Sequence, residues 1–266
     1  MDCNYWFETA NVSCFKNGIE VVKDLNLKLK YSENVILLGP NGSGKSSIIE
    51  LINRNIYPIV RNESTLKIFD KELIDLWELR KRISTVNSEI KNRINPNLKL
   101  LDLVISGLHG KFCYVSNKSQ RDIAIAEKII NTMHLNKLSH KAYSFMSDGE
   151  RQIALIARAL VNSPEILILD EPIANLDYRS KFYVIDKINE LTNLNTKVFC
   201  VTHDISMITN VYNRIVMLKD RSIFAEGTQR EVMTSENINQ LFDIKIQVTE
   251  ENGSWHIKRY LDNNYQ

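Results

Sequence analysis

An octapeptide at residues 39–46, Gly-Pro-Asn-Gly-Ser-Gly-Lys-Ser, sets narrow limits on the fold of this chain. It follows the apolar run at 35–38 and precedes a stretch of helical character, the strand–loop–helix context that the G-x-x-x-x-G-K-[ST] pattern requires. Glycines let the backbone wrap around a phosphate chain, so that amide N–H groups and a helix N-terminus face the negative charge. This phosphate loop therefore predicts that the chain binds a nucleoside triphosphate, with Lys45 reaching the β- and γ-phosphates and Ser46 ligating Mg²⁺.

The size and charge of the chain exclude several classes of protein. Its 266 residues fit one large α/β domain or two small ones, and 44% hydrophobic with 25% charged residues is ordinary for a globular protein. The 34 basic and 32 acidic residues give a net charge of +2. This balance leaves no electrostatic footprint for nucleic acid and no basic patch for a membrane surface.

Cysteine spacing and hydropathy favour a cytosolic chain without a membrane anchor of its own. Cys3, Cys14, Cys113 and Cys200 are scattered without C-x-x-C spacing, so neither a disulfide framework nor a zinc site is expected. The longest apolar runs are far shorter than the ~18–20 residues of a spanning helix. The N-terminus lacks the pattern of a signal peptide.

Periodicity predicts an α/β nucleotide-binding core interrupted by a mostly helical insertion at about 90–162 and followed by a tail at about 228–266. Strands separated by helices favour parallel pairing through crossovers. The expected strands lie at 19–22, 25–29, 35–38, 66–69, 83–86, 166–169, 198–201, 215–218 and 223–225, with short β-like runs near 246 and 256. The expected helices lie at 46–54, from 101 onward, and at 121–133, 147–161 and 235–242.

Two adjacent carboxylates, Asp170 and Glu171, end the apolar strand at 166–169. The carboxyl end of a parallel strand is where a phosphate-loop enzyme needs an acid for its Mg²⁺. Alternation along a strand points neighbouring side chains in opposite directions. Asp170 is therefore predicted to face the metal, and Glu171 to orient or deprotonate the attacking water; a solvated acidic turn is the alternative.

A histidine and a helix start complete the candidate residues. His203 follows the apolar strand at 198–201, where an imidazole can hydrogen-bond the γ-phosphate; a structural role is the alternative. Ser147 and Glu150 form a capping box before an apolar-periodic run. That box leaves Gly149 unexplained, and it exposes a helix N-terminus that can also bind an anion.

These motifs together resemble the ATP-binding-cassette (ABC) ATPases. The resemblance covers about residues 12–227. It comprises the Walker A loop at 39–46, the signature segment at 146–152, the Walker B strand at 166–170 with Glu171, a D-loop at 174–177, and His203.

The resemblance implies a single ABC ATPase domain over 1–266, with a RecA-like phosphate-loop core, an antiparallel β subdomain and a helical subdomain. It implies a head-to-tail dimer with a second copy or a homologous ATPase, in which ATP lies between the Walker A loop of one copy and the signature segment of the other. An aromatic residue of the first strands stacks on adenine, and Phe15 matches it best, an ordinary aromatic being the alternative. The implied ATP contacts are Phe15, Gly39, Asn41, Gly42, Ser43, Gly44, Lys45, Ser46, Ser47, Ser147, Gly149 and Glu150; the Mg²⁺ ligands are Ser46 and Asp170, and the catalytic residues Glu171 and His203.

The resemblance also implies where such a chain is located and which partners it has. A chain of this kind docks, as a peripheral subunit at the cytoplasmic side of the cell membrane, on integral membrane transporter subunits, and no nucleic acid is expected as a partner. Asp148 and the tail at 231–242 look like the ATPases of iron-chelate, haem and cobalamin importers. The leading hypothesis is an ATPase subunit that powers import of a metal chelate or related solute. The alternatives are a soluble non-transport ABC ATPase and a nucleotide-binding regulatory protein.

One position departs from the family pattern. Ser88 stands where the family places a glutamine that reaches Mg²⁺ and the membrane subunits. Its side chain is too short to substitute directly, so Glu89, Lys91 or a water covers the role. The sequence leaves open the cargo, the direction of transport, and whether the dimer joins identical chains.

Overall fold

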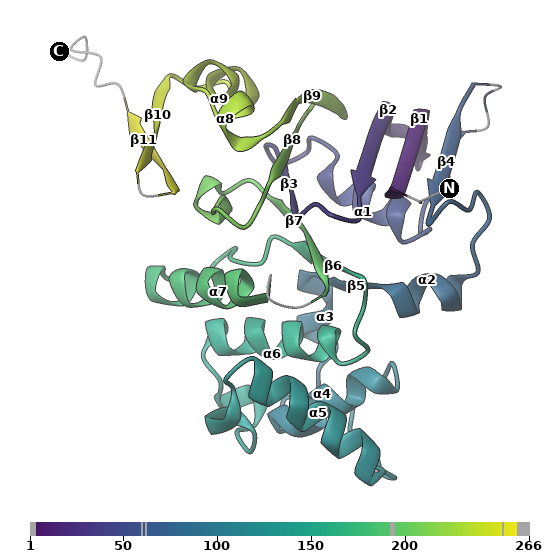
Figure 1. The fold of residues 1–266 in the computed structure, drawn as a ribbon, viewed down its shortest axis with the longest axis vertical. Helices are drawn as coiled ribbons and strands as arrows, with labels where there is room; N and C mark the ends of the chain where they lie inside the picture. Colours follow the sequence, from purple (N-terminus) through teal and green to yellow (C-terminus); the bar gives the residue numbers. More distant parts are fainter. Residues whose placement is uncertain (1–3, 60, 62, 192–194, 252, 260–266) are drawn as a thin grey trace. The chain divides into compact units, whose positions relative to one another are not determined.

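The computed structural model describes residues 4–59, 61, 63–191, 195–251 and 253–259 (Figure 1). The chain forms two compact units, described separately below. The first unit comprises residues 1–79 and 199–266, and the second comprises residues 80–198. The α2 helix (Leu76–Arg82) and the β7 strand (Lys197–Thr202) cross the boundaries between these ranges.

An antiparallel layer of the order β2-β1-β4 forms part of the first unit. Its strands are β1 (Tyr5–Lys16), β2 (Ile19–Lys30) and β4 (Thr65–Ile68). Asn17 and Gly18 join β1 to β2 with positive φ angles of 53° and 78°, as a two-residue hairpin turn requires. The sequence analysis predicted two short strands within β2 and did not predict β1.

The core strands of the first unit surround β3 (Val35–Leu38), all four residues of which are buried. On either side β3 pairs in parallel with β7 and with β8 (Arg214–Lys219). The β9 strand (Ser222–Gly227) returns antiparallel to β8. A strand that is buried on both faces has a continuous apolar sequence. For this reason β3, β7 and β8 were predictable from the sequence.

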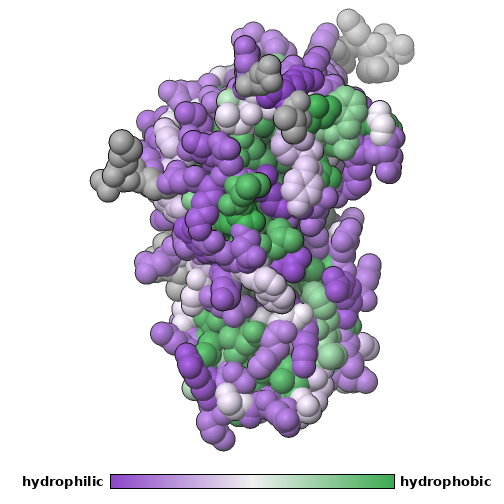
Figure 2. Space-filling view, turned by 90° about the vertical axis from the view of Figure 1, so that its right-hand side faces the viewer, coloured by the Kyte–Doolittle hydropathy of each residue, from purple (hydrophilic) through white to green (hydrophobic). Residues whose placement is uncertain are grey.

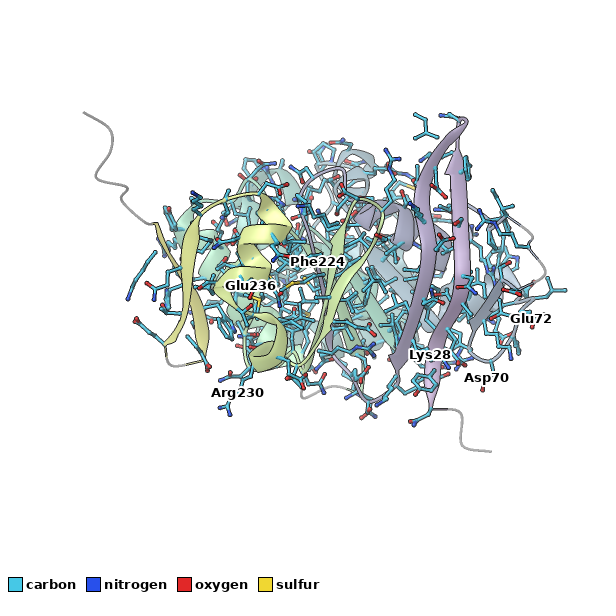
Figure 3. All side chains as sticks on the ribbon, turned by 90° about the horizontal axis from the view of Figure 1, so that it is seen from above. Lys28, Asp70, Glu72, Phe224, Arg230 and Glu236 are labelled. Atoms are coloured by element: carbon cyan, nitrogen blue, oxygen red, sulfur yellow. The ribbon has the colours of Figure 1, made fainter. Side chains whose placement is uncertain are left out.

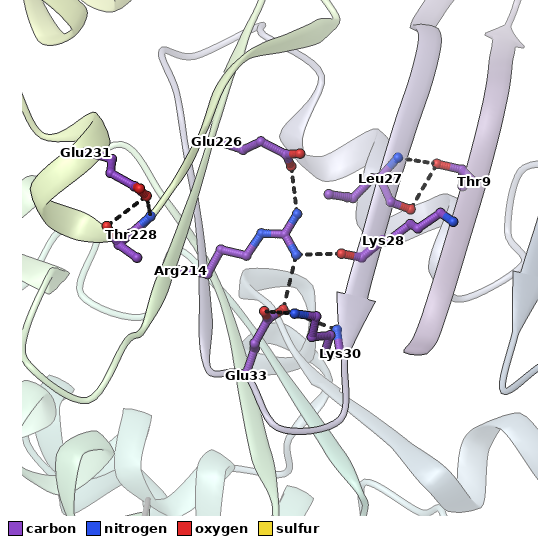
Figure 4. Close-up of polar contacts among 9 residues, drawn as sticks. All are labelled: Thr9, Leu27, Lys28, Lys30, Glu33, Arg214, Glu226, Thr228 and Glu231. Atoms are coloured by element: carbon purple, nitrogen blue, oxygen red, sulfur yellow. Dashed lines mark hydrogen bonds and ion pairs between the residues drawn. The ribbon is translucent and has the colours of Figure 1, made fainter. Parts of the chain in front are cut away.

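Arg214 ties the antiparallel layer to the core strands within the first unit (Figure 4). Its Nη1 donates to the Lys28 carbonyl oxygen at 2.6 Å and to Glu33 at 3.1 Å, and its Nη2 donates to Glu226 at 2.8 Å. The guanidinium thus joins β8, the end of β2 and β9. A planar fork of donors suits such a bridge better than a lysine would.

The tail of the first unit runs from α8 (Gln229–Val232) and α9 (Ser235–Phe242) into a hairpin of β10 (Ile246–Glu251) and β11 (Ser254–Arg259). This C-terminal hairpin appears in yellow in Figure 1. The expected helix at 235–242 and the β-like runs near 246 and 256 are present.

The second unit is mainly helical. Its strands β5 (Ile83–Val86) and β6 (Ile166–Asp170) pair in parallel. The α4 helix packs against α5 and α6, and α6 also packs against α7 and β5. Its helices are α3 (Ser88–Arg93), α4 (Leu100–Leu108), α5 (Gln120–Thr132), α6 (Asp148–Leu160) and α7 (Tyr178–Glu190), with 3-10 turns at Asn136–Leu138 and Tyr143–Phe145.

These elements confirm the predicted α/β fold with an antiparallel β layer and a helical part. The insertion at 90–162 and the tail at 228–266, as subdivisions of a single domain, stay predictions. The face drawn in Figure 2 is mainly hydrophilic, with apolar side chains in patches. Within the described ranges, no helix has both the length and the hydropathy to cross a bilayer.

Three of the cysteines lie in the described residues, and none of these three is in a disulfide. Cys14 and Cys200 are buried and Cys113 is exposed. Burial raises the pKa of the Cys14 thiol to about 11, so this thiol is protonated at neutral pH. Cys3 lies outside the described residues.

Candidate nucleotide-binding site

The phosphate loop connects β3 to α1 (Lys45–Ile52) in the first unit. Gly44 takes the left-handed conformation, with a φ of 101°, at the N-cap of α1. No side chain caps this helix, and its first turn holds no acidic residue. Backbone N–H groups at a helix start need partners, and the helix dipole favours an anion there. The N-terminus of α1 is therefore suited to a phosphate group.

Close backbone contacts hold the loop in shape. A Cβ at Gly39 would lie 2.3 Å from the Leu218 carbonyl oxygen, and one at Gly44 would lie 2.8 Å from the Val21 carbonyl oxygen. The Arg221 N–H donates to the Ser43 carbonyl at 3.0 Å. The turn between β8 and β9 and the strand β2 thus support the loop from outside, and only glycine fits at the two contact points.

The ammonium group of Lys45 is held inside the loop. The Lys45 side chain belongs to a residue that is only 6% exposed, and Nζ donates to the carbonyl oxygens of Gly39 at 2.7 Å and Pro40 at 2.9 Å. A buried cation is costly unless it is hydrogen-bonded or paired with an anion. The loop therefore holds the positively charged Lys45 ammonium, which the sequence predicts to bind the β- and γ-phosphates.

The Ser43 hydroxyl is a further polar group of the loop. Its Oγ is buried and has no hydrogen-bond partner in the described part of the chain. Buried polar atoms without partners are rare in folded proteins and call for a ligand or water. A hydroxyl donor, a buried ammonium and an uncapped helix N-terminus converge within residues 43–46. This donor set suits the oxygens of a triphosphate.

His203 lies next to the loop through the backbone of β7. The Gly39 N–H donates to the Thr202 carbonyl oxygen at 3.3 Å, and His203 follows Thr202 directly. His203 is exposed. Asp204, the next residue, caps the 3-10 turn η4 (Ile205–Met207) by accepting from the Ser206 N–H at 3.0 Å. The first unit thus brings the predicted histidine and the phosphate loop together.

The remaining predicted contacts of the first unit are accessible. Asn41, Gly42 and Ser46 are exposed, and Ser47 is half-buried. Phe15, in β1, is 45% exposed, and the adjacent Lys16 forms an ion pair with Glu50 of α1 at 2.7 Å. Phe15 is therefore a surface aromatic on the strand that is tied to the helix of the loop.

Asp170 and Glu171 belong to the second unit. Asp170 is the last residue of β6 and is half-buried. Glu171 is half-buried with a φ of 48°, which is uncommon for a residue with a Cβ. Such strained backbone is often found at functional sites. Glu171 lies just beyond the end of β6, so the roles predicted for the two carboxylates stay predictions.

The capping box at the start of α6 is present in full. The Glu150 N–H donates to the Ser147 Oγ at 3.2 Å, and the Ser147 N–H donates to the Glu150 carboxylate at 2.8 Å. Lys141 adds an ion pair with Glu150 at 2.6 Å. Burial opposes the ionised carboxylate, yet the bonds from Lys141 and Ser147 lower the pKa of Glu150. The cap uses the Ser147 hydroxyl as an acceptor, so its proton remains available to an anion.

Gly149 has a packing role that the capping box did not explain. A Cβ at Gly149 would lie 3.1 Å from the Ser180 Cβ and 3.3 Å from its Oγ. Ser180 is itself held by Asp177, the N-cap of α7, through bonds of 2.9 and 3.0 Å. Glycine therefore lets α6 approach the first turn of α7.

Ser88, the position that departs from the family pattern, is the first residue of the short helix α3 and is exposed. Asn87 caps this helix by accepting from the Ile90 N–H at 3.3 Å. Lys91 belongs to the same helix. Burial lowers the pKa of Lys91, and the charge of Asp148 in the signature segment acts in the opposite direction.

The sequence analysis missed the residues that hold the site from behind. Thr202, Leu218 and Arg221 contact the loop through backbone atoms, and a sequence pattern does not reveal backbone contacts.

No group of three or more His, Cys, Asp or Glu residues in the described ranges is arranged to hold a metal ion. Magnesium commonly takes one or two protein oxygens together with phosphates and waters.

Comparison with known proteins points to one family. A family model described as "ABC transporter" matches residues 22–174. The chain is 31% identical to the uncharacterized ABC transporter ATP-binding protein MJ0873 of Methanocaldococcus jannaschii, over 90% of this chain and 81% of that protein. It is 28% identical to the zinc import ATP-binding protein ZnuC of Ehrlichia chaffeensis, over 90% of each.

Solved structures agree in fold. A structure described as an inward-facing conformation of a metal-chelate type ABC transporter superposes with a TM-score of 0.77 at 23% identity, covering 96% of this chain and 97% of that chain. A dimeric ATP-binding cassette, MJ0796, in a post-hydrolysis state with ADP and Pi superposes with a TM-score of 0.66 at 28% identity, covering 84% and 98%.

Proposed function

The chain belongs to the ABC transporter ATPases, and on that premise we propose that it is the ATP-hydrolysing subunit of an importer for a metal chelate or a related small solute. The observation that carries the nucleotide part is the phosphate loop. Its buried Ser43 hydroxyl, the buried Lys45 ammonium and the uncapped start of α1 all lie within residues 43–46. These are the donors that a triphosphate requires.

Most of the predicted residues have a stated role in this proposal. Lys45 binds the β- and γ-phosphates, and the residues of the loop bind them through backbone N–H groups. Ser46 and Asp170 are the proposed protein ligands of Mg²⁺, which neutralises charge on the phosphates. Glu171 orients and deprotonates the attacking water, and His203 hydrogen-bonds the γ-phosphate. Phe15 stacks on the adenine ring.

The signature segment serves a second copy of the chain. Ser147, which is exposed, is the N-cap of α6, and Gly149, which is buried, lies in its first turn; an anion is favoured at such a helix start. We propose that this end binds the γ-phosphate held by the loop of a partner copy or a homologous ATPase. The dimeric state of the MJ0796 cassette supports this arrangement. Loss of the γ-phosphate then removes the contact that closes the dimer, which is a population shift driven by differential contacts.

The transport part of the proposal places the chain on membrane-spanning subunits at the cytoplasmic face. Support comes from the printed description of a similar cassette, cbiO1, as part of the transporter complex cbiONQ. Support for the cargo comes from the zinc import relative and from the metal-chelate type transporter structure. Asp148 and the tail at 231–242 add the sequence likeness to chelate importers.

ATP turnover by the purified chain tests the nucleotide part. We expect Mg²⁺-dependent ATP hydrolysis that Lys45→Ala lowers at least about a hundredfold, because the variant loses the cation of the loop. Lys81→Ala, which removes an exposed lysine of α2, is the matched control. Absence of ATP turnover from the wild-type chain would contradict the proposal.

Purification from native membranes tests the transport part. We expect a tagged chain to be recovered in mild detergent with an integral membrane protein, identified by mass spectrometry, and the complex to bind or move a metal chelate. Recovery of the chain with no integral membrane partner would favour the alternative, a soluble ABC ATPase or nucleotide-switch protein.

A further inference from the structure

The C-terminal hairpin rests on the segment that follows His203. Within the first unit, β11 packs against η4. Gly253, between β10 and β11, has a φ of 77°, and a Cβ there would lie 2.2 Å from the Asn210 Nδ2. The hairpin therefore meets this segment at two places, and the positive φ of Gly253 favours a glycine at one of them.

Gln229 links the hairpin to the same segment by hydrogen bonds. The Trp255 Nε1 of β11 donates to the Gln229 Oε1 at 2.9 Å. The Gln229 Nε2 donates to the carbonyl oxygens of Thr209 at 2.8 Å and Tyr212 at 2.6 Å. All three contacts fix the amide in one orientation. Its neighbour Arg230 is exposed at the periphery (Figure 3), so of these two α8 side chains only Gln229 joins the hairpin to the segment.

The other end of the segment is fixed at the phosphate loop. The Thr202 carbonyl accepts from the Gly39 N–H, and the Asp204 N–H donates to the Thr202 Oγ1 at 3.0 Å. The Ser206 N–H and Oγ both donate to Asp204 Oδ1, at 3.0 and 2.7 Å. His203 thus lies between an anchor on the loop and a turn on which the C-terminal hairpin rests.

We propose that the C-terminal hairpin positions His203 for ATP hydrolysis, with Trp255 and Gln229 as positioning residues that act through the segment 204–212. This inference rests on the proposed function, in which His203 hydrogen-bonds the γ-phosphate. A side chain must be held close to its productive geometry, because a displacement of about 1 Å can cost up to a hundredfold in rate. The hairpin supplies that restraint from outside the site.

Two variants of the full chain test the link. Gln229→Leu removes all three hydrogen bonds, and Trp255→Phe keeps a ring but removes the donor. We expect kcat for ATP to fall about tenfold in Gln229→Leu and less in Trp255→Phe, with an unchanged KM because the phosphate loop is untouched. In the nucleotide-free protein, amide hydrogen exchange over 203–212 should accelerate several-fold, while α1 exchanges as in the wild type. Ile257→Ala, on the same strand at a side chain 49% exposed, is the control.

A double-mutant cycle with His203→Ala separates positioning from general damage. If Gln229 acts through His203, Gln229→Leu has no further effect on the residual kcat of His203→Ala. A tenfold loss that persists in the His203→Ala background overturns the inference, as does a wild-type kcat in both single variants. Either result leaves the proposed function standing. A wild-type chain without ATP turnover instead overturns the proposed function itself.

Discussion

At the scale of single residues, Glu171 offers the sharpest test of chemistry. Replacement by glutamine keeps the size of the side chain but removes its ability to accept a proton from water. We expect Glu171→Gln to lower the kcat for ATP by about 10²–10⁴ while the chain still binds ATP. Turnover and nucleotide affinity, measured on the same preparation, check this, and Glu127→Gln on an exposed part of α5 is the control. Turnover near that of the wild type would remove Glu171 from the role of base.

Residues differ in how much of their role the sequence reveals. The loop glycines and Lys45 were predictable because their spacing is set by contact with a phosphate chain. The packing of Gly149 was not predictable, since it faces Ser180, which lies 31 positions away in another helix. The close approach of the Leu218 carbonyl to Gly39 and the hydrogen bond from the Arg221 N–H to the Ser43 carbonyl are made by backbone atoms. Contacts made by backbone atoms do not restrict the type of the residue that makes them. Their only trace in the sequence is the glycine that the close approach requires on the other side.

At the scale of elements, the contact between α6 and α7 at Gly149 can be tested by adding one methyl group. Alanine improves helix propensity by up to ~1 kcal/mol, but overpacking a tight contact costs about 1–3 kcal/mol. Because Asp177 holds Ser180 by two bonds, we expect the cost to prevail. Gly149→Ala should lower the midpoint of urea unfolding. In a Ser180→Gly background, where the facing Cβ is gone, the same change should no longer destabilise. A raised midpoint in the single variant would mean that α7 gives way.

The capping box of α6 gives a second test at this scale, through pH. The pKa of Glu150 is lowered from the ordinary 4.5, so its ionised form stabilises the folded state above that pH. This stabilisation is lost as the pH falls through the lower folded-state pKa. We expect the difference in unfolding free energy between the wild type and Glu150→Gln to be constant at neutral pH and to shrink below about pH 4.5. Urea titrations from pH 7 to pH 3 measure it. A difference that does not change with pH would show that the charge of Glu150 plays no part.

At the scale of the whole molecule, the elements set by local sequence patterns were predictable, and the features set by contacts between distant residues were not. The buried strands β3 and β6 and the helices α5 and α6 were predicted to within two residues, because periodicity and capping are local signals. The β1 strand escaped because its pairing with β2 shifts register near Thr9 and Val12, and Asn11 has a φ of 48°. Such bulges break the alternation by which a strand is read. The Arg214 bridge escaped because Glu33 is 181 positions away.

That bridge carries the last prediction. Arg214→Met leaves Glu33 and Glu226 without the guanidinium that joins them, and Glu33 is largely buried there, with a side chain 15% exposed. Hydrogen bonds to charged groups are each worth about 1.5–3 kcal/mol, and partial exposure reduces this. We expect the unfolding free energy to fall by about 2 kcal/mol, with faster amide exchange in β2. Arg61→Ala breaks a pair with Asp24 whose side chains are 49% and 54% exposed. That loss should cost less than about 1 kcal/mol. Equal losses in the two variants would mean that Arg214 is one more surface charge and that the antiparallel layer is held by its apolar contacts alone.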